Sequence, residues 1–222
     1  AMRFGRRLWV VPNHEPPPTD PDAVMVRLDP GLAFGTGTHP STALCLTWLD
    51  AHLQTGATVI DYGSGSGVLA VAAAKLGARA VHAFDIDPQA LIATRENAAA
   101  NDVANVVAIH ERADSLPHPV AVVVANILAG TLIELAPQLC GYLQPGGQLI
   151  LAGILKQQVH EVRSARHRHH RAGHHREHLV QRAEHHEEQE AHRAQVNQRE
   201  LVRVTAEQQR ARGDQRERRG EE

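Results

Sequence analysis

A glycine-rich loop between two apolar runs constrains this chain more than any other feature. The loop, residues 61–67, reads Asp-Tyr-Gly-Ser-Gly-Ser-Gly and lies between the apolar runs 58–60 and 68–74. This order predicts a strand, a tight turn and a helix. Glycine adopts positive φ without strain and lets a ligand approach the main chain, while the N–H groups of the next helix attract polar groups. The loop predicts a ligand site, although a simple tight turn fits the same residues.

An acidic residue follows the next predicted strand. Asp85 comes 22 positions after Gly63, at the end of a strand predicted over residues 80–85. Nucleotide-binding folds place a carboxylate about 20 residues beyond the loop, where it binds the ribose hydroxyls. Asp87 precedes Pro88, a pair typical of a helix start. We expect Asp85 to face the ligand and Asp87 to cap the helix.

The spacing of the glycines separates classes of nucleotide. A dinucleotide loop has its third glycine three positions after the second, and Val68 occupies that position here. The glycines at 63, 65 and 67 alternate instead. S-adenosylmethionine carries no phosphate, so it needs close backbone approach rather than an anion cradle. The spacing therefore favours a methyltransferase over a dinucleotide oxidoreductase.

Strands and helices alternate through the first two thirds of the chain. The predicted strands cover residues 23–28, 58–61, 80–85, 106–110, 120–125 and 148–154, and the predicted helices cover 41–53, 67–76, 88–101 and 129–142. This alternation predicts an α/β fold, a Rossmann-like parallel sheet with right-handed crossovers. Ligands bind beyond the carboxyl ends of such strands, so Gly63, Asp85 and Asn126 should converge on one crevice. A cap of the following helix is the alternative role for Asn126.

The composition changes near residue 155. Residues 156–222 contain no Phe, Trp, Tyr, Ile, Met, Pro or Cys, and they hold 10 of the 16 His. Such a segment buries too little apolar surface to offset its ordering entropy. We expect a disordered or helical polar tail after a sheet that ends at its fifth strand. The expected domains are a lead-in over 1–33, an S-adenosylmethionine-binding methyltransferase domain over 34–155 and a low-complexity tail over 156–222.

The tail has two further interpretations. His170, His174 and His178 are spaced four apart and would share a helix face, but a segment without a core cannot hold metal ligands rigidly, so we expect no functional metal. Residues 200–205 are its single candidate strand. The excess of Arg, His and Gln also fits out-of-frame translation of a GC-rich gene, which translating the coding DNA in its other frames would test.

Charge and hydropathy exclude several partners. The formal net charge is −2 and both signs are interspersed through the tail, so no sustained positive surface for nucleic acid is expected. The apolar runs are far shorter than the roughly 18 residues of a membrane-spanning helix.

Cys45 and Cys140 resemble small buried hydrophobic residues rather than a disulfide or metal pair. We expect a cytoplasmic monomer that contacts neither nucleic acid nor membranes.

The block Phe34-Gly-Thr-Gly-Thr-His-Pro-Ser-Thr42, together with these motifs and Asn126-Ile127-Leu128, carries a family resemblance. From about Met2 to Leu155 the chain resembles the ribosomal protein L-eleven methyltransferases, a family of class I S-adenosylmethionine-dependent enzymes. The resemblance implies S-adenosylmethionine as methyl donor and puts four residues on its binding positions, namely Thr42, Gly63, Asp85 and Asn126. The glycine loop adds Gly65 to these candidates.

The resemblance also implies a reaction: methylation of lysine side chains and the N-terminal amine of the large-subunit ribosomal protein L-eleven. Methyl transfer from a sulfonium needs mainly orientation and a neutral amine, so we assign no catalytic residue with certainty. Deprotonating a lysine at pH 7 costs about 4–5 kcal/mol. The site must therefore hold the neutral amine with acceptors, and the resemblance points to Asn126 and nearby main-chain carbonyls.

Two departures from the family qualify this interpretation. Family members carry an N-terminal substrate-recruiting domain that would precede this chain, so we expect S-adenosylhomocysteine to bind while the ribosomal protein is methylated slowly. The tail also replaces a helix and two strands. The alternatives are another class I methyltransferase, which a substrate panel would identify, and an inactive truncated or frame-shifted product, which would show no melting shift with S-adenosylhomocysteine.

Overall fold

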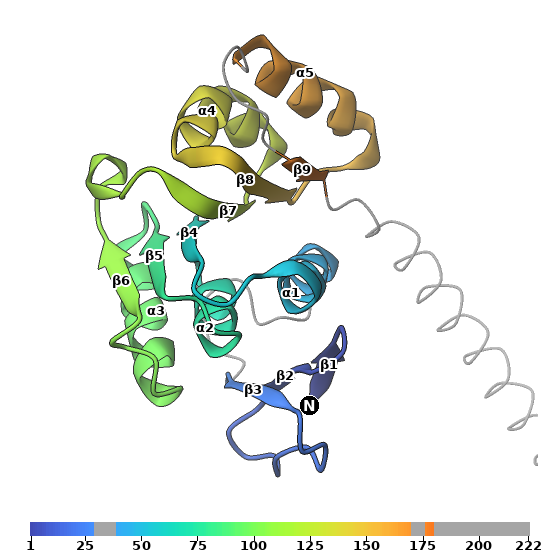
Figure 1. The fold of residues 1–222 in the computed structure, drawn as a ribbon, viewed down its shortest axis with the longest axis vertical. Coiled ribbons are helices and arrows are strands. Elements are labelled where there is room, and N and C mark those ends of the chain that lie inside the picture. Colours follow the sequence, from blue (N-terminus) through green and yellow to red (C-terminus); the bar gives the residue numbers. More distant parts are fainter. Residues whose placement is uncertain (29–38, 170–175, 180–222) are drawn as a thin grey trace, which may run out of the picture. The chain divides into compact units, whose positions relative to one another are not determined.

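A parallel sheet is the centre of the computed structural model, which describes residues 1–28, 39–169 and 176–179. Its strands are β4 (Thr58–Tyr62), β5 (Ala80–Phe84), β6 (Val107–His110), β7 (Val120–Asn126), β8 (Leu143–Ala152) and β9 (Arg176–Leu179). They lie in the order β6-β5-β4-β7-β8-β9, with every neighbouring pair parallel (Figure 1). The chain winds outward from β4 to β6 and then returns to β7 on the other side of β4, which creates a topological switch point. The predicted Rossmann-like α/β fold is confirmed.

Helices cover both faces of this sheet (Figure 1). On one face lie α1 (Pro40–His52), α2 (Val68–Lys75) and α3 (Pro88–Ala100), and on the other lie α4 (Ala129–Gly141) and α5 (Val159–His169). Strand side chains alternate between faces. Accordingly Val59 packs in the hydrophobic cluster of α1 and α2, whereas Ile60 packs in the cluster of α4 and α5. Burial on both faces explains the nearly continuous apolar runs of the central strands.

A second, three-stranded sheet precedes the helices. It consists of β1 (Met2–Phe4), β2 (Leu8–Val11) and β3 (Val24–Arg27), in that order. Strand β3 matches the predicted strand at 23–28, whereas β1 and β2 were not predicted. Their inward side chains, among them Phe4, Leu8 and Val10, join the same cluster as α1 and α2. The small sheet therefore extends the core of the domain that contains the large sheet.

The carboxylate of Asp50 fastens the turn between β1 and β2 to α1. Its Oδ2 accepts the backbone N–H groups of Arg6 and Arg7, the latter at 3.3 Å, and the Arg7 guanidinium Nε lies 3.6 Å from Oδ1. The side chain of Asp50 is completely buried. Gly5 has a φ of +72°, and a Cβ at this position would collide with the Asp50 carboxylate. The turn therefore requires glycine at position 5.

Residues beyond 155 contribute more structure than their composition predicts. Helix α5 packs against α4 and buries Val162 and Ala165. Strand β9 then adds a sixth strand beside β8. Main-chain groups make these ladder bonds, so a sequence without an apolar alternation can still form an edge strand. Because His178 lies in this strand, it cannot share a helix face with the histidines at 170 and 174, which, like residues 200–205, lie outside the described residues.

The two cysteines are not joined by a disulfide. Cys45 is buried and Cys140 is half-buried, in agreement with the prediction that they resemble small hydrophobic residues. No helix in residues 1–28, 39–169 or 176–179 has the length and apolarity needed to cross a membrane. Within the same ranges, no three His, Cys, Asp or Glu side chains gather closely enough to hold a metal ion.

Removing the Asp50 carboxylate should destabilise the domain strongly. Asp50→Ala leaves the partly buried N–H groups of Arg6 and Arg7 without their acceptor, and each such loss costs about 1–3 kcal/mol. We expect the free energy of unfolding to fall by about 2–4 kcal/mol in urea denaturation. Asp114→Ala is the matched control, because its ion pair with Arg112 is exposed and should contribute little. Equal losses in the two variants would contradict a role of Asp50 as an anchor.

Candidate functional site

The glycine loop leaves β4 at the carboxyl edge of the sheet and turns directly into α2. Gly63, Gly65 and Gly67 have φ values of +81°, +54° and +75°, a region that side-chain-bearing residues rarely adopt. The N–H of Gly63 donates to the carbonyl oxygen of Phe84 at 2.8 Å, which fixes the loop to the end of β5. A Cβ on Gly67 would lie 2.9 Å from the Cα of Thr94 on α3. The glycines thus let the loop pass tightly between β5 and α3.

Asp85 closes the loop from the end of β5. Its Oδ2 accepts the N–H of Gly65 at 2.9 Å, and its Oδ1 accepts the N–H of Asp87 at 3.0 Å. Asp87 caps α3 as predicted, because its carboxylate accepts the N–H of Gln89 at 2.9 Å and Pro88 begins the helix. The structure brings Gly65 and Asp85 together and gives the two aspartates different roles.

Asn126 ends β7 and reaches across to α1. Its amide Nδ2 donates to the hydroxyl Oγ1 of Thr42 at 3.0 Å, although the two residues are 84 positions apart. The alternative role of Asn126 as a helix cap is wrong, because α4 begins after Leu128 and has no side-chain cap. Thr42 lies in the first turn of α1, which His39 caps by accepting the N–H of Ser41. The Thr42 contact leaves the amide oxygen Oδ1 as an acceptor.

Ile127 was not among the predicted site residues, yet it links three strands. A Cβ on Gly63, after β4, would collide with the Ile127 side chain. On its other side lies Gly153, which follows β8 with a φ of +80°. A Cβ there would lie 2.5 Å from the carbonyl oxygen of Ile127 and 3.3 Å from Oδ1 of Asn126. Both acceptors therefore lie beside Gly153, and a glycine near the end of the predicted strand 148–154 was the signal available in the sequence.

Asp61, the first residue of the loop motif, is completely buried. Its Oδ2 accepts the N–H of Ala70 in α2 at 3.0 Å, whereas its Oδ1 has no hydrogen-bond partner in the described chain. Burial raises the pKa of Asp61 to about 7; the Ala70 N–H opposes this rise and the negative charge of Asp85 adds to it. A buried oxygen without a partner calls for an explanation. A cationic group of a ligand at the loop would supply one.

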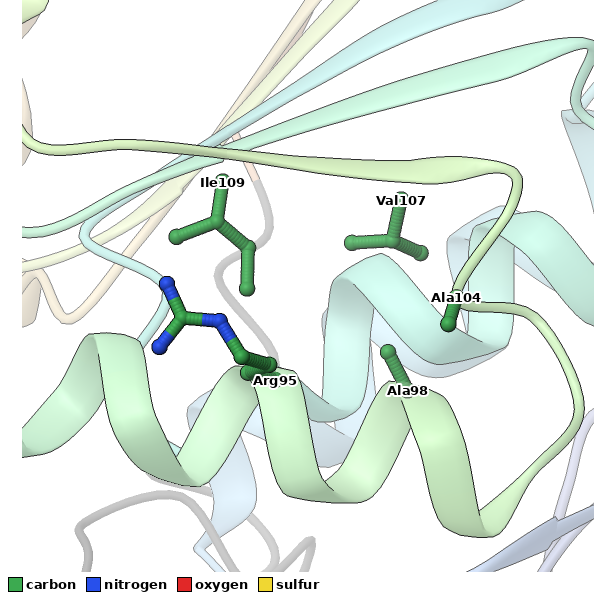
Figure 2. A pocket seen from close by; sticks show the side chains of 5 residues that line it. All are labelled: Arg95, Ala98, Ala104, Val107 and Ile109. Carbon is green, nitrogen blue, oxygen red and sulfur yellow. The ribbon is translucent and has the colours of Figure 1, made fainter.

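A separate cavity of about 270 Å³ lies between α3 and β6 (Figure 2). It is lined by Arg95, Ala98, Ala104, Val107 and Ile109. Figure 2 shows one guanidinium among small apolar side chains, with the Arg95 head group turned toward Ile109. None of the predicted site residues lines this cavity. The candidate site therefore lies at the ends of β4, β5 and β7 instead.

The sheet order and the glycine loop define a class I methyltransferase fold. The structure of a precorrin-6y C5,15-methyltransferase from Geobacter metallireducens GS-15 shares this fold, with a TM-score of 0.50 and 23% identity over 58% of this chain and 70% of that one. The family described as "Ribosomal protein L11 methyltransferase (PrmA)" matches residues 1–186. The chain belongs to this family, which confirms the resemblance seen in its motifs.

Individual relatives agree with the family match. A ribosomal protein L11 methyltransferase of Vibrio cholerae serotype O1 is 59% identical over 162 residues, which is 72% of this chain and 55% of the relative. One from Azotobacter vinelandii is 56% identical over 166 residues, 74% of this chain and 56% of the relative. The crystal structure of a ribosomal protein L11 methylase from Lactobacillus delbrueckii subsp. bulgaricus superposes with a TM-score of 0.70 at 37% identity, covering 76% and 87% of the two chains. The chain thus spans about half the length of the curated relatives it matches.

The titration of Asp61 should appear in the pH dependence of stability. Its pKa is raised from 3.8 to about 7 in the folded protein, so its stabilising contribution is present below pH 3.8 and is lost as the pH rises to about 7. Asp61→Asn has no titrating group at this position, so the free energy of unfolding of the variant should not fall over this pH range for this reason. Relative to wild type it should rise by up to roughly 4 kcal/mol between pH 4 and pH 7. Urea denaturation at several pH values measures the difference. A difference that stays constant from pH 4 to 7 would contradict the assignment.

Proposed function

We infer that this domain binds S-adenosylmethionine and transfers its methyl group to an amine of ribosomal protein L11. The convergence of Gly65 with Asp85, and of Thr42 with Asn126, at one edge of the sheet carries this proposal. These residues come from four separate segments of the chain. Membership of the family and the names of its relatives support the substrate.

The donor half of the proposed site lies around the glycine loop. When bound, S-adenosylmethionine supplies an electrophilic methyl group on its sulfonium. The Asp85 carboxylate would accept the ribose hydroxyls, and the loop at Gly63 and Gly65 offers the close backbone approach that the ligand needs. Oδ1 of Asp61, which has no hydrogen-bond partner among the described residues, would accept a hydrogen bond from the ammonium group of the amino-acid tail. The residues present therefore fit this donor.

The acceptor half lies around Asn126. Its Oδ1 and the main-chain oxygen of Ile127 face the same space beside Gly153. Two neutral acceptors can take the N–H bonds of a neutral amine and leave its lone pair for the methyl group. This preference for the neutral form matters because deprotonating a lysine at pH 7 costs about 4–5 kcal/mol. Thr42 would keep the amide oriented, since it occupies the Nδ2 side.

Loss of the Asp85 carboxylate should weaken donor binding. Hydrogen bonds to a charged group contribute about 1.5–3 kcal/mol, so Asp85→Ala should lower the affinity for S-adenosylhomocysteine about 10- to 100-fold in calorimetry. Asp87→Ala is the matched control two residues away. It removes the cap of α3 and about 1 kcal/mol of stability, but it should leave the affinity unchanged. Equal affinities for S-adenosylhomocysteine in wild type and Asp85→Ala would contradict the proposed donor site.

Methyl transfer itself tests the acceptor half. We expect the 222-residue chain to transfer labelled methyl groups from S-adenosylmethionine to purified ribosomal protein L11, more slowly than the Vibrio cholerae relative, whose length it covers by 55%. Asn126→Ala should lower the rate at saturating donor at least tenfold, because an amine acceptor is lost; saturation keeps any weaker donor binding at this residue out of the comparison. A rate equal to that of the relative, or an unchanged rate in Asn126→Ala, would contradict this account.

A further inference from the structure

A row of polar side chains runs along the inner face of α3. Thr94, Asn97 and Asn101 are spaced three and four residues apart, so they share one face of the helix. Thr94 is fully buried and Asn101 is only 2% exposed, although polar residues are mostly found at the surface. None of the three was among the predicted site residues. Because buried polar groups cost free energy unless they are bonded, their partners indicate what they do.

Thr94 binds the carbonyl group of Gly65. Its hydroxyl Oγ1 donates to that carbonyl oxygen at 3.2 Å and lies 3.1 Å from the Oγ of Ser64. A hydroxyl has one hydrogen to donate, so Ser64 is the donor in the second contact. The N–H of Gly65 donates to Asp85 from the other side. Both main-chain groups of this glycine are therefore fixed by side chains, one from α3 and one from the end of β5.

Asn97 binds the next carbonyl group of the loop. Its amide Nδ2 donates to the carbonyl oxygen of Ser66 at 2.8 Å. The two neighbouring carbonyls are bonded within the loop and its helix, since Gly67 N–H donates to Ser64 and Val71 N–H donates to Gly67. Two of these four carbonyl groups thus depend on side chains of α3. Without those side chains, peptide groups next to glycine would be free to rotate.

Asn101 continues the row but binds a different part of the fold. Its Oδ1 accepts the N–H of Arg27 and its Nδ2 donates to the carbonyl oxygen of Arg27, both at 2.7 Å. Its Nδ2 also donates to the main-chain oxygen of Asn97 at 2.8 Å. Among the described residues, these hydrogen bonds join α3 to β3 of the small sheet and not to the glycine loop. Asn101 therefore offers a buried control on the same helix face.

We propose that Thr94 and Asn97 are positioning residues for the methyl donor. They hold the carbonyl groups of Gly65 and Ser66 from α3, so that the N–H of Gly65 stays against Asp85 and the loop keeps the shape that admits the ligand. They act through the loop and not by contact with the donor. The proposal rests on the proposed donor site and adds residues to it.

Calorimetry of S-adenosylhomocysteine binding to the full chain tests this role. Thr94→Val keeps the side-chain shape and removes the hydroxyl, whereas Thr94→Ser keeps the hydroxyl. We expect Thr94→Val and Asn97→Ala each to lower the affinity roughly three- to tenfold, because each loses a hydrogen bond to the loop. Thr94→Ser should bind within about twofold of wild type. Melting curves identify a temperature at which every variant is folded, and the affinities are measured there.

Asn101→Ala is the matched control. It removes three hydrogen bonds of a buried side chain, so it should lower the melting temperature at least as much as Thr94→Val does. Its affinity for S-adenosylhomocysteine should equal that of wild type, because its partners lie in β3 and α3. A double-mutant cycle adds a second control. If Thr94 acts on Asp85 through Gly65, Thr94→Val should cost less affinity in the Asp85→Ala background than in wild type.

The outcomes separate this inference from the proposed function. If wild type does not bind S-adenosylhomocysteine, the donor site is wrong and the positioning role is wrong with it. If wild type binds but Thr94→Val and Asn97→Ala bind equally well, the positioning role alone is overturned. Equal losses in Thr94→Ser and Thr94→Val would overturn it too, as would a loss in Asn101→Ala that matches that in Asn97→Ala. So would a loss from Thr94→Val that is the same with and without Asp85.

Discussion

The close approach of Ile127 to two glycines is the contact on which the arrangement of the site depends. Gly63 follows β4 and Gly153 follows β8, and neither has room for a Cβ because the side chain and the carbonyl oxygen of Ile127 lie against them. The residue before Ile127 is Asn126, whose amide donates to Thr42 on a helix 84 residues earlier. The tightly packed residue of this edge is thus the direct neighbour of the residue that joins β7 to α1.

The three aspartates around the glycine loop differ in how deeply they are buried and in what they bind. Asp87 is exposed and caps a helix, whereas Asp85 is partly buried and binds the loop and the start of the next turn. Asp61 is fully enclosed, so burial raises its pKa to about 7. All three belong to or follow strands β4 and β5. All three accept a backbone N–H, and they differ in how far each carboxylate lies from solvent.

Much of this arrangement was predictable from local patterns. Asp87-Pro88 fixed the start of α3, and the glycine alternation fixed the turn after β4, because each depends on neighbouring residues. The strands β1 and β9 were not predicted, because each is at most four residues long, contains charged residues and owes its pairing to main-chain bonds; β2 was missed although its four residues are all apolar. Ile127 was not predicted as a site residue for a different reason. Its role depends on contacts with Gly63 and Gly153, which are distant in sequence.

The order of strands in the large sheet has a consequence for how the chain acquires its structure. Val59 of the central strand pairs with Val122, so β4 lacks one neighbour until most of the domain has left the ribosome. Non-local pairing of this kind makes folding slow and leaves strand edges open to other chains meanwhile. The apolar runs of β4 and β7, which are buried in the finished sheet, therefore stay exposed during synthesis until the two strands pair.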